Sequence, residues 1–339
     1  MKIWLPAIRA YSGTDVYTTR LADGLRRRGI EVEITWFPKR FEMAASMLKA
    51  VEPPKGTDLV LANSWNGFAF KRAHIPLVIV EHLYVFDEAY RPFKTFAQHI
   101  YHETLVRRRE EASFAKADAV VAVSASTAAS MERGSKLGHI HVIHNWIDVD
   151  VFQPRLEHTP LDDGQPFRLL FVGNPSKRKG ADMLGPIMSA LGPKFELRYT
   201  SGLKNRQVWT AANMRPLGSL SQPEVIRAYH ECDALLFPSR LEGFAYAALE
   251  AMACGVPVVA SDASSLPEAI EDGVSGSLCE SGNVSAFVGA CRRLAADQNL
   301  LQDMGRAARE RVVRFFSEEA SIVKYVCLFD SLLGSVKSR

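Results

Sequence analysis

The chain has 339 residues, of which 47% are hydrophobic and 23% are charged, and its formal net charge is +3. A chain of this length usually forms more than one hydrophobic core, which favours two α/β domains. The small net charge gives no reason to expect a nucleic-acid partner, and no stretch approaches the 18 consecutive apolar residues that a membrane span needs.

The five cysteines all lie in the second half of the chain, and none forms a CxxC pair. An odd number of cysteines without metal spacing indicates reduced thiols in a cytosolic protein. The apolar stretch at the N-terminus is too short for a signal peptide. We therefore expect a cytoplasmic protein without a metal site.

The first half alternates apolar strand patterns with helical ones. It opens with a strand at 2–8, a loop at 9–15 and an amphipathic helix at 16–28 that ends at Gly29. This opening is typical of a doubly wound sheet, whose ligands bind beyond the carboxyl ends of the strands. The loop has no GxGxxG motif, so the main sequence evidence for a nicotinamide cofactor is missing. The further strands expected in this half are 31–36, 58–62, 76–80, 118–124 and 141–144.

His82 follows the strand 76–80 almost directly. A histidine at this edge of a parallel sheet can serve as a neutral base toward a ligand. It can equally be a loop histidine that only makes hydrogen bonds, and position alone does not separate the two.

Residues 93–114 predict one long helix, with apolar positions broadly on one face and the basic run Arg107–Arg109 beside it. Such a helix can rest on an anionic membrane surface. A solvated face of a domain is the commoner explanation and the one that we favour.

The second half repeats the strand–loop–helix pattern after a linker. Residues 152–165 contain prolines, a glycine and acidic side chains without apolar periodicity, which indicates a linker. A strand at 167–172, the loop 173–180 and a helix ending at Leu191 follow. The remaining elements expected are strands at 196–200, 234–237 and 256–260 and helices at 224–231, 245–253 and 284–297. Two Rossmann-like domains with a cleft between them are the expected architecture.

The stretch 238–261 carries the strongest chemical pattern. Glu242 and Glu250 bracket the N-terminus of the expected helix, where free backbone amides favour an anion. Acids at both ends of an anion pocket suit a nucleotide sugar, which has hydroxyls at both ends and a diphosphate between them. Taken alone, Glu242 could instead stabilise the helix end and Glu250 could be a solvated surface residue.

Together these motifs resemble the retaining glycosyltransferases of family four, which have the GT-B fold and are also called glycosyl transferases group 1. The resemblance rests on the E-x7-E motif from Glu242 to Glu250, the glycine–basic–glycine loop 173–180, and the turn residues from Glu268 to Gly276. It implies an acceptor domain at 1–153, a nucleotide-sugar domain at 166–315, and a C-terminal helix at 316–339 that packs back on the first domain.

The resemblance also implies the roles of individual residues. His82, Lys179 and Glu242 would be catalytic. The donor would be bound by Gly13, Asn174, Arg178, Lys179, Glu242, Gly243, Phe244, Ala245 and Glu250. The resemblance implies a nucleoside-diphosphate sugar as donor, a glycan or glycolipid hydroxyl as acceptor, transfer with retention, and no metal or other cofactor.

Several positions depart from the family pattern. Asn174 stands where the family usually has arginine, and Ser12, Trp146 and Ala245 each replace a glycine. Two alternatives follow: a GT-B-fold nucleotide-sugar epimerase, or a catalytically inactive subunit that binds a nucleotide sugar. A C-terminal helix that merely caps the second domain is a further alternative to one that packs back on the first.

Overall fold

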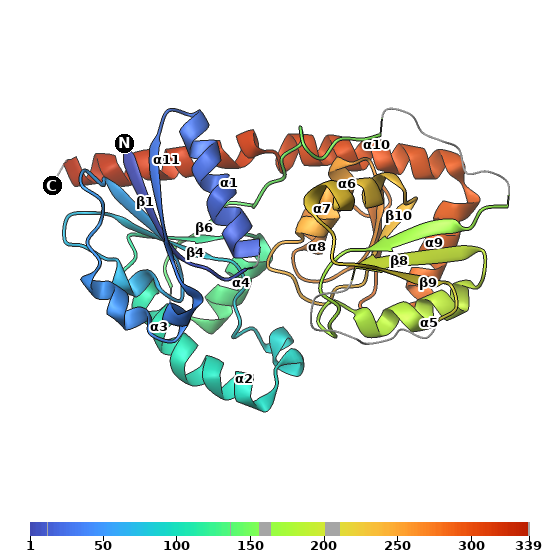
Figure 1. Cartoon of the computed structure of the whole chain (residues 1–339), viewed down its shortest axis with the longest axis horizontal. Helices are drawn as coiled ribbons and strands as arrows, with labels where there is room; N and C mark the ends of the chain where they lie inside the picture. The colour runs from blue at the N-terminus through green and yellow to red at the C-terminus, as the bar shows by residue number, and fades with distance from the viewer. Residues whose placement is uncertain (12, 136, 156–163, 201–210, 338–339) are drawn as a thin grey trace. The chain divides into compact units, whose positions relative to one another are not determined.

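The computed structural model describes residues 1–11, 13–135, 137–155, 164–200 and 211–337, and it divides the chain into two compact units. The first unit comprises Met1–Asn145 and Glu318–Arg339, and the second comprises Trp146–Ser317. Each unit contains a six-stranded sheet in which neighbouring strands are parallel (Figure 1). The predicted α/β architecture with two doubly wound sheets is confirmed.

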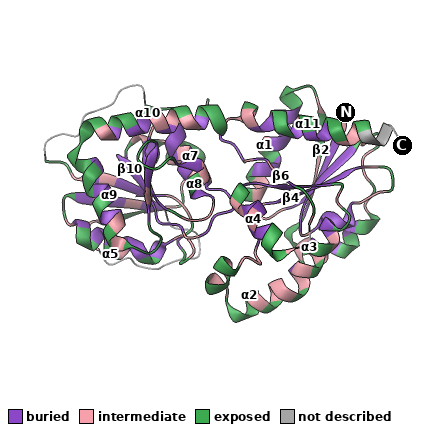
Figure 2. Ribbon diagram, turned by 180° about the vertical axis from the view of Figure 1, so that it is seen from behind, coloured by how far each residue is buried: buried purple, intermediate pink, exposed green. Residues whose placement is uncertain are grey.

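The sheet of the first unit has the strand order β2-β1-β3-β4-β5-β6. Its strands are β1 (Lys2–Ile8), β2 (Glu31–Phe37), β3 (Leu59–Asn63), β4 (Leu77–Glu81), β5 (Ala119–Ala122) and β6 (Ile140–Val142). The central strands β3, β4 and β5 are buried along their whole length, which explains why their sequences are continuous apolar runs (Figure 2).

The helices of the first unit differ from expectation mainly at 93–114. They are α1 (Gly13–Arg27), α2 (Phe96–Tyr101), α3 (Arg107–Phe114), α4 (Ala125–Gly134) and α11 (Glu318–Lys337), with short helices η1 (Lys39–Glu42), η2 (Ala45–Ala50), η3 (Gly67–Ala69) and η4 (Glu88–Phe93). The expected start at 93 is wrong because Pro92 closes η4 and a capping box of Thr95 and Gln98 begins α2. The π-helical turn His102–Val106 joins α2 to α3.

The sheet of the second unit has the strand order β12-β11-β10-β7-β8-β9. Its strands are β7 (Phe167–Phe171), β8 (Phe195–Thr200), β9 (Met214–Gly218), β10 (Ala234–Phe237), β11 (Val258–Ser261) and β12 (Gly276–Cys279). Its helices are α5 (Ala181–Leu191), α6 (Gln222–His230), α7 (Tyr246–Ala253), α8 (Leu266–Ala269), α9 (Val284–Ala296) and α10 (Gln298–Phe315).

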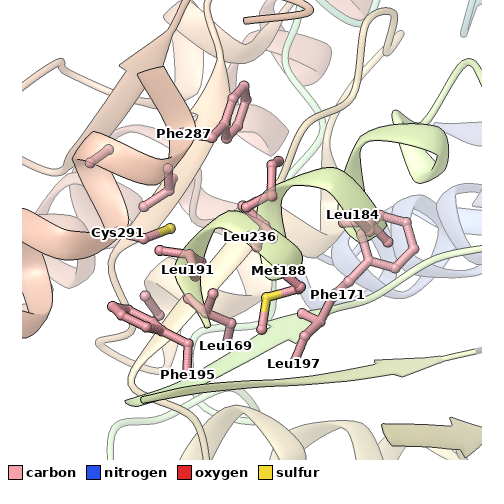
Figure 3. Packing of buried hydrophobic residues seen from close by; sticks show 14 of the residues in the cluster. Leu169, Phe171, Leu184, Met188, Leu191, Phe195, Leu197, Leu236, Phe287 and Cys291 are labelled. Carbon is pink, nitrogen blue, oxygen red and sulfur yellow. The ribbon is translucent and has the colours of Figure 1, made fainter. Parts of the chain in front are cut away.

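The core of the second unit is built where α5 and α9 pack on the sheet. Leu184 and Met188 on α5 lie with Leu169 and Leu197 of the strands, and Phe287 comes from α9 (Figure 3). All five side chains are fully buried. None of the five cysteines is paired, and four of them are buried.

Four elements of the second unit were absent from the sequence interpretation, and one of them is the short helix α8, where turn residues were expected. Strand β9 lies at a sheet edge, carries Pro216 and is largely exposed, so it has no apolar run. Strand β12, at the opposite edge, begins at Gly276 and was expected to be a turn. Helix α10 begins where the Asp297 side chain accepts from the Leu300 amide, an N-cap signal that the sequence does contain.

The boundary expected at residue 153 lies instead at Asn145. Trp146, Ile147 and Phe152 are buried, and they group with the second unit. The Arg309 guanidinium of α10 fastens this segment by donating to the carbonyls of Phe152 (2.6 Å) and Val149 (2.9 Å). Of the expected linker 152–165, residues 156–163 lie outside the described residues.

The C-terminal helix α11 packs on α1 in the first unit, as predicted (Figure 1). It begins at Glu318 rather than at the expected residue 316, because α10 continues to Phe315. Gly24 of α1 permits the close approach, since a Cβ there would lie 2.8 Å from Ile322 Cδ1. The alternative of a helix that caps the second unit is therefore wrong.

Candidate active site

The predicted donor residues gather where the second sheet changes direction. Strands β7 and β10 are neighbours in the sheet although β8 and β9 lie between them in sequence. In doubly wound folds the loops that leave the carboxyl ends of two such strands form the ligand crevice. Here these loops are 172–180 after β7 and 238–245 after β10.

The two loops are fastened to each other by their backbones. The Arg240 amide donates to the Arg178 carbonyl at 2.9 Å. Gly180 has a φ of +68°, and a Cβ at this position would lie 1.9 Å from the Pro238 carbonyl oxygen. The second glycine of the glycine–basic–glycine loop is therefore required by this close approach and by its own backbone conformation.

Glu242 is the centre of a buried charge cluster. Its carboxylate is 2.8 Å from Lys179 Nζ and 3.4 Å from Arg178 Nη1, and it accepts from the Ser239 hydroxyl at 2.6 Å. Burial alone would raise the pKa of this carboxyl. The charges of Lys179 and Arg178 and the hydrogen bonds from Lys179 and Ser239 outweigh burial and hold the pKa below its usual range. Glu242 is thus a fixed anion beside two cations at neutral pH.

The backbone of Glu242 is held by the loop after β11. Ser264 Oγ donates to the Glu242 carbonyl at 2.6 Å, and Ser265 Oγ lies 3.2 Å from the same oxygen. Ser264 has a φ of +55°, a conformation that non-glycine residues adopt rarely. Sequence reasoning missed both serines, which lie 22 and 23 residues from Glu242 and so offer no local signal.

Gly243, Phe244 and Ala245 follow Glu242, are buried and lead directly into α7. Ala245 is the N-cap of α7, no side chain caps this end, and its first turn carries no acidic residue. Glu242 therefore does not cap α7 through a side-chain hydrogen bond. The Tyr246 amide donates to the Phe244 carbonyl at 3.1 Å, and the positive end of the helix favours an anion that approaches from the loop side.

Glu250 lies farther along α7 and is half-buried. The Tyr229 hydroxyl of α6 is 3.2 Å from Glu250 Oε2. Burial, and then the charge of Glu250, raise the pKa of Tyr229 well above its ordinary value, so this hydroxyl is a donor at every working pH. Glu250 is therefore oriented by Tyr229 rather than freely solvated. Asn174, on the loop after β7, is exposed to solvent.

His82 and Gly13 belong to the first unit. His82 Nε2 is 3.0 Å from Asn63 Oδ1, a carbonyl oxygen that can only accept, so Nε2 carries the proton and Nδ1 the lone pair. Burial lowers the pKa of His82 to about 4, which keeps the imidazole neutral at pH 7. The Tyr17 ring of α1 packs edge-on against the imidazole of His82, and the two ring centroids are 4.6 Å apart.

Gly13 is the first residue of α1 and therefore lies one turn before Tyr17. The preceding loop is held by Asp15, whose carboxylate accepts from the Ala10 amide at 2.9 Å and the Tyr11 amide at 3.0 Å. The start of α1 and the end of β4 thus lie at one place in the first unit. Ser12, the other residue of the family match in this loop, lies outside the described residues.

A cavity of about 530 Å³ opens at the opposite, amino-terminal edge of the second sheet. It is lined by Asp233 before β10, by Gly255 and Pro257 before β11, and by Arg309 of α10. No predicted donor residue lines it, so its size alone does not make it the site of the chemistry. Within the described residues, no group of three or more histidine, cysteine or acidic side chains is arranged to hold a metal ion.

Two family profiles match this chain. The profile described as Glycosyltransferase Family 4 matches residues 35–151, and the one described as Glycosyl transferases group 1 matches residues 157–311. The chain belongs to the family 4 glycosyltransferases. The second profile covers the β7 loop, Glu242 and Glu250, which are the residues whose geometry is described above.

A D-inositol 3-phosphate glycosyltransferase of Arthrobacter sp. (strain FB24) is similar to this family member. The two are 30% identical over 226 residues, which are 60% of this chain and 54% of the relative. The chain spans about half the length of the curated relatives that it matches first.

Solved structures share the fold along nearly the whole chain. A sucrose-phosphate synthase from Thermosynechococcus elongatus has a TM-score of 0.83 at 20% identity, covering 99% of this chain and 100% of its own. Anabaena Alr3699/HepE, solved in complex with UDP and glucose, has a TM-score of 0.75 at 18% identity, covering 98% of this chain and 100% of its own. The two sheets of this chain therefore form a GT-B glycosyltransferase fold.

Proposed function

We propose that this family 4 glycosyltransferase moves a hexose or hexose derivative from a nucleoside-diphosphate sugar to a hydroxyl acceptor, with retention of anomeric configuration and without a bound metal. The observation that carries the proposal is the Glu242 carboxylate, buried against Lys179 and Arg178 beside the uncapped start of α7. This arrangement provides two cations and one anion beside a helix N-terminus at the switch point of the sheet.

The cations and amides suit the departing diphosphate. Negative charge develops on the leaving phosphate as the glycosidic bond breaks, and preorganised donors stabilise it most when they are fixed beforehand. Lys179 and Arg178 are held in place by Glu242 and by the loop carbonyls around them. We assign Lys179 to the phosphates, with Arg178 as the second basic contact that Asn174 cannot supply.

The carboxylates suit the hydroxyls at the two ends of the donor. Glu242 would accept from hydroxyls of the sugar and Glu250 from those of the ribose, while Gly243, Phe244 and Ala245 present backbone to the diphosphate. Gly13 would let the diphosphate approach the first unit closely, and His82 would contact the donor sugar or the acceptor. Support for such a donor comes from the related fold of Anabaena Alr3699/HepE, whose solved complexes contain UDP, glucose or UDP-glucose.

No side chain near Glu242 is offered as a covalent nucleophile. Its neighbours are the cations Lys179 and Arg178 and the buried Ser239 hydroxyl, and all three are bound to the Glu242 carboxylate itself. We therefore propose that the acceptor hydroxyl attacks from the face that the phosphate leaves, and that a phosphate oxygen takes its proton.

The first experiment is a thermal-shift screen of the purified chain against UDP-, GDP- and ADP-glucose. One donor should raise the melting temperature, and Glu250→Ala should weaken that shift. Mass spectrometry with candidate glycan and glycolipid acceptors, followed by NMR of the anomeric proton, then identifies the product and its configuration. Absence of transfer from every donor that binds would exclude the proposed reaction.

The alternatives are separated by the same reagents. An epimerase would produce the epimeric nucleotide sugar without any acceptor, and an inactive binding subunit would bind a donor without hydrolysis or transfer. Neither alternative accounts for the full Glu242-to-Glu250 arrangement as well as a transferase does, because a transferase must stabilise a leaving diphosphate at every turnover.

We further propose that the acceptor belongs to cell-envelope glycan or glycolipid synthesis and that the enzyme works in the cytoplasm, in peripheral contact with an anionic membrane. No helix among the described residues is both long and apolar enough to cross a bilayer. Phe96 is 80% exposed on α2, and Arg108 is exposed on α3. Arg107 and Arg109 are already bound, to Glu103 and to loop carbonyls, so the basic run offers less free charge than its sequence indicates.

Sedimentation with phosphatidylglycerol vesicles should therefore deplete the protein at low salt, and Phe96→Ser should reduce the bound fraction. Phosphatidylcholine vesicles are the control. Equal recovery in the supernatant with both lipids, together with full activity on water-soluble acceptors, would exclude the membrane contact.

A further inference from the structure

The cavity at the amino-terminal edge of the second sheet, which has no place in the proposed chemistry, has the size of a small-molecule site. Its volume is about 530 Å³, and pockets for small ligands span roughly 300–1,000 Å³. All of its lining residues belong to the second unit. One face of α10 forms a wall with Gln302, Arg306 and Arg309, and the C-terminal ends of α6 and α7 supply Tyr229 and Cys254.

Positive charge predominates on the cavity wall. The lining contains four arginines and two acids, namely Arg155, Arg168, Arg306, Arg309, Asp233 and Glu310. Within this described lining, only Arg168 binds one of the acids, with Nη2 2.8 Å from Asp233 Oδ1 and Nε 3.2 Å from Oδ2. Guanidinium groups stay charged at every working pH, so cations exceed carboxylates on this wall by two.

The other guanidinium groups keep donors for a ligand. Arg309 donates to three backbone carbonyls, at 2.6, 2.8 and 2.9 Å, and a guanidinium has five N–H donors in all. Arg306 is bound to Asp303, but the two side chains are 75% and 64% exposed, and such surface pairs contribute little. Arg155 is exposed and forms no ion pair with another described residue. These three arginines can therefore turn to an anion at small cost.

A small organic phosphate matches the chemistry of this wall. A phosphate monoester carries a charge of about −1.5 to −2 at pH 7 and three acceptor oxygens, which corresponds to the excess of cations. The planar guanidinium fork binds such a group through two parallel hydrogen bonds. The lining also includes Cys254, Val256, Pro257 and Leu301, whose apolar surface suits a carbon body.

Two contacts connect the cavity with Glu250. Tyr229 lines the cavity, and its hydroxyl is 3.1 Å from the Ala247 carbonyl oxygen and 3.2 Å from Glu250 Oε2. Arg309 donates to the Ala253 carbonyl at 2.8 Å and so also offsets the negative end of the α7 dipole. Helix α7 itself packs on α10 (Figure 1). A ligand that orders Tyr229 and Arg309 therefore acts on the short helix that carries Glu250.

We propose that this cavity is a second ligand site, that it binds a small organic phosphate through Arg155, Arg306 and Arg309, and that its occupation strengthens nucleotide binding at Glu250. The coupling rests on the proposed function, because it takes Glu250 as a nucleotide contact, whereas the site itself does not. Ordering of α7 by the first ligand is the physical reason for the coupling, since less conformational entropy is then lost when the second ligand binds.

Isothermal titration calorimetry of the whole chain tests the site, with glucose 6-phosphate, glycerol 3-phosphate, inorganic phosphate and neutral glucose as probes. At least one organic phosphate should bind more tightly than inorganic phosphate, and glucose should not bind. Arg306→Ala should weaken this binding about tenfold, because a charge-assisted hydrogen bond is lost. Arg314→Ala, which removes an exposed arginine of α10 outside the cavity, is the matched control and should leave binding unchanged.

Substitutions in the cavity and in the donor loop locate the bound phosphate. Gln302 is exposed and lines the cavity, so Gln302→Trp should fill the space and abolish binding, whereas Gln302→Ala should retain it. Lys179→Ala, in the loop after β7, should also retain it. Binding that is lost in Lys179→Ala and kept in Gln302→Trp would place the phosphate at the donor loop and overturn the second site. Failure of both organic phosphates to bind would overturn it as well.

Hydrogen exchange tests the coupling without a sugar donor. Saturation with the organic phosphate that binds should slow exchange of the α7 amides, and Tyr229→Phe, which removes only the hydroxyl, should reduce this effect. Unchanged exchange of α7 at saturation would overturn the coupling.

Nucleotide affinity gives the second readout of the coupling. Whichever of UDP, GDP and ADP binds the chain should bind about fivefold more tightly or better when the cavity is saturated. The gain should disappear in Gln302→Trp, where direct competition at the donor loop would persist. Equal nucleotide affinity with and without the organic phosphate would overturn the coupling. A chain that binds the organic phosphate in the cavity but no nucleotide would refute the proposed function and leave the second site standing.

Discussion

At the scale of single residues, two glutamates that look alike in sequence have different surroundings. Glu242 is 6% exposed and is held by Lys179, Arg178 and Ser239, whereas Glu250 is half-buried and meets the Tyr229 hydroxyl. A buried carboxylate surrounded by cations resists protonation and keeps its geometry. A half-buried carboxylate that meets a hydroxyl group can exchange this contact for a ligand hydroxyl at lower cost.

Lys179→Ala should abolish sugar transfer and destabilise the second unit. It leaves the buried Glu242 carboxylate with one cation fewer, and we expect a loss of about 1–3 kcal/mol in the free energy of unfolding at pH 7. Urea denaturation followed by fluorescence measures this loss. Lys194→Ala, which removes an exposed charge from the same unit, is the control and should change stability little.

The stability lost in Lys179→Ala should depend on pH, because the pKa of Glu242 is lowered in the folded chain. The lowered pKa of Glu242 contributes stability that is present above the unfolded carboxyl range and is lost as the pH falls through the folded value. Lys179→Ala removes part of this contribution, so the difference between wild type and variant should shrink below about pH 4. A difference that grows in acid would contradict the assignment of Glu242 as a fixed anion.

At the scale of elements, the pairing of α11 with α1 joins the two ends of the chain. Tyr17 and Tyr325 are fully buried, and their hydroxyl oxygens are 2.6 Å apart. Ile322 and Phe329 lie on the same face of α11 as Tyr325 and are also buried. Periodic apolar residues in α11 predicted the helix, but they carried no information on which surface it covers.

The single substitutions Tyr17→Phe and Tyr325→Phe should each lower the free energy of unfolding more than the double substitution does. Each single change leaves one buried hydroxyl without its partner, at about 1–3 kcal/mol, whereas removing both hydroxyls is nearly neutral. A double-mutant cycle from urea denaturation should therefore give a coupling energy of about 1 kcal/mol or more. Additive effects of the two changes would show that the hydroxyls do not depend on each other.

The basic run of α3 shows why a charge pattern is a weak predictor of function. In sequence Arg107, Arg108 and Arg109 are equivalent, but Arg107 stacks on Phe86 with its guanidinium 4.2 Å from the ring centroid and Arg109 binds the Met43 carbonyl at 2.5 Å. Only contacts with residues far along the chain distinguish them, so the membrane hypothesis had to be reduced to Arg108 and the exposed Phe96.

At the scale of the whole molecule, the two cores are separate. One contains α5 and α9 with strands β7 and β8, and the other is built on β1, β3 and β4. The last helix belongs to the first unit although the whole second unit precedes it in the chain.

Deleting residues 318–339 should therefore weaken the first unit and spare the second. The deletion exposes Tyr17, Leu21 and the rest of the α1 face that α11 covers. Hydrogen exchange of the full chain and the truncated chain should show faster exchange in α1 and unchanged protection in β7 and β10. The opposite pattern, with protection lost first in the second unit, would contradict the division at Asn145 and Ser317.

Local patterns in the amino-acid sequence were sufficient for the class of fold and for most of its strands. Strands such as Val78–Val80 and Leu235–Phe237 are buried on both faces, so each is a continuous apolar run whose meaning does not depend on distant residues. The E-x7-E spacing is likewise a local pattern, which runs from the loop after β10 into α7. Strand β9 was missed because an edge strand with Pro216 has no such run.

Contacts between residues far apart in sequence settled what local patterns could not. Lys179 meets Glu242 because β7 and β10 are neighbours in the sheet. The domain boundary moved to Asn145 for the same reason, since Arg309 on α10 fastens the segment around Val149 and Phe152. Hydrophobic periodicity is a property of neighbouring residues, whereas ion pairs and domain membership arise only when the folded backbone brings distant side chains within a few ångströms.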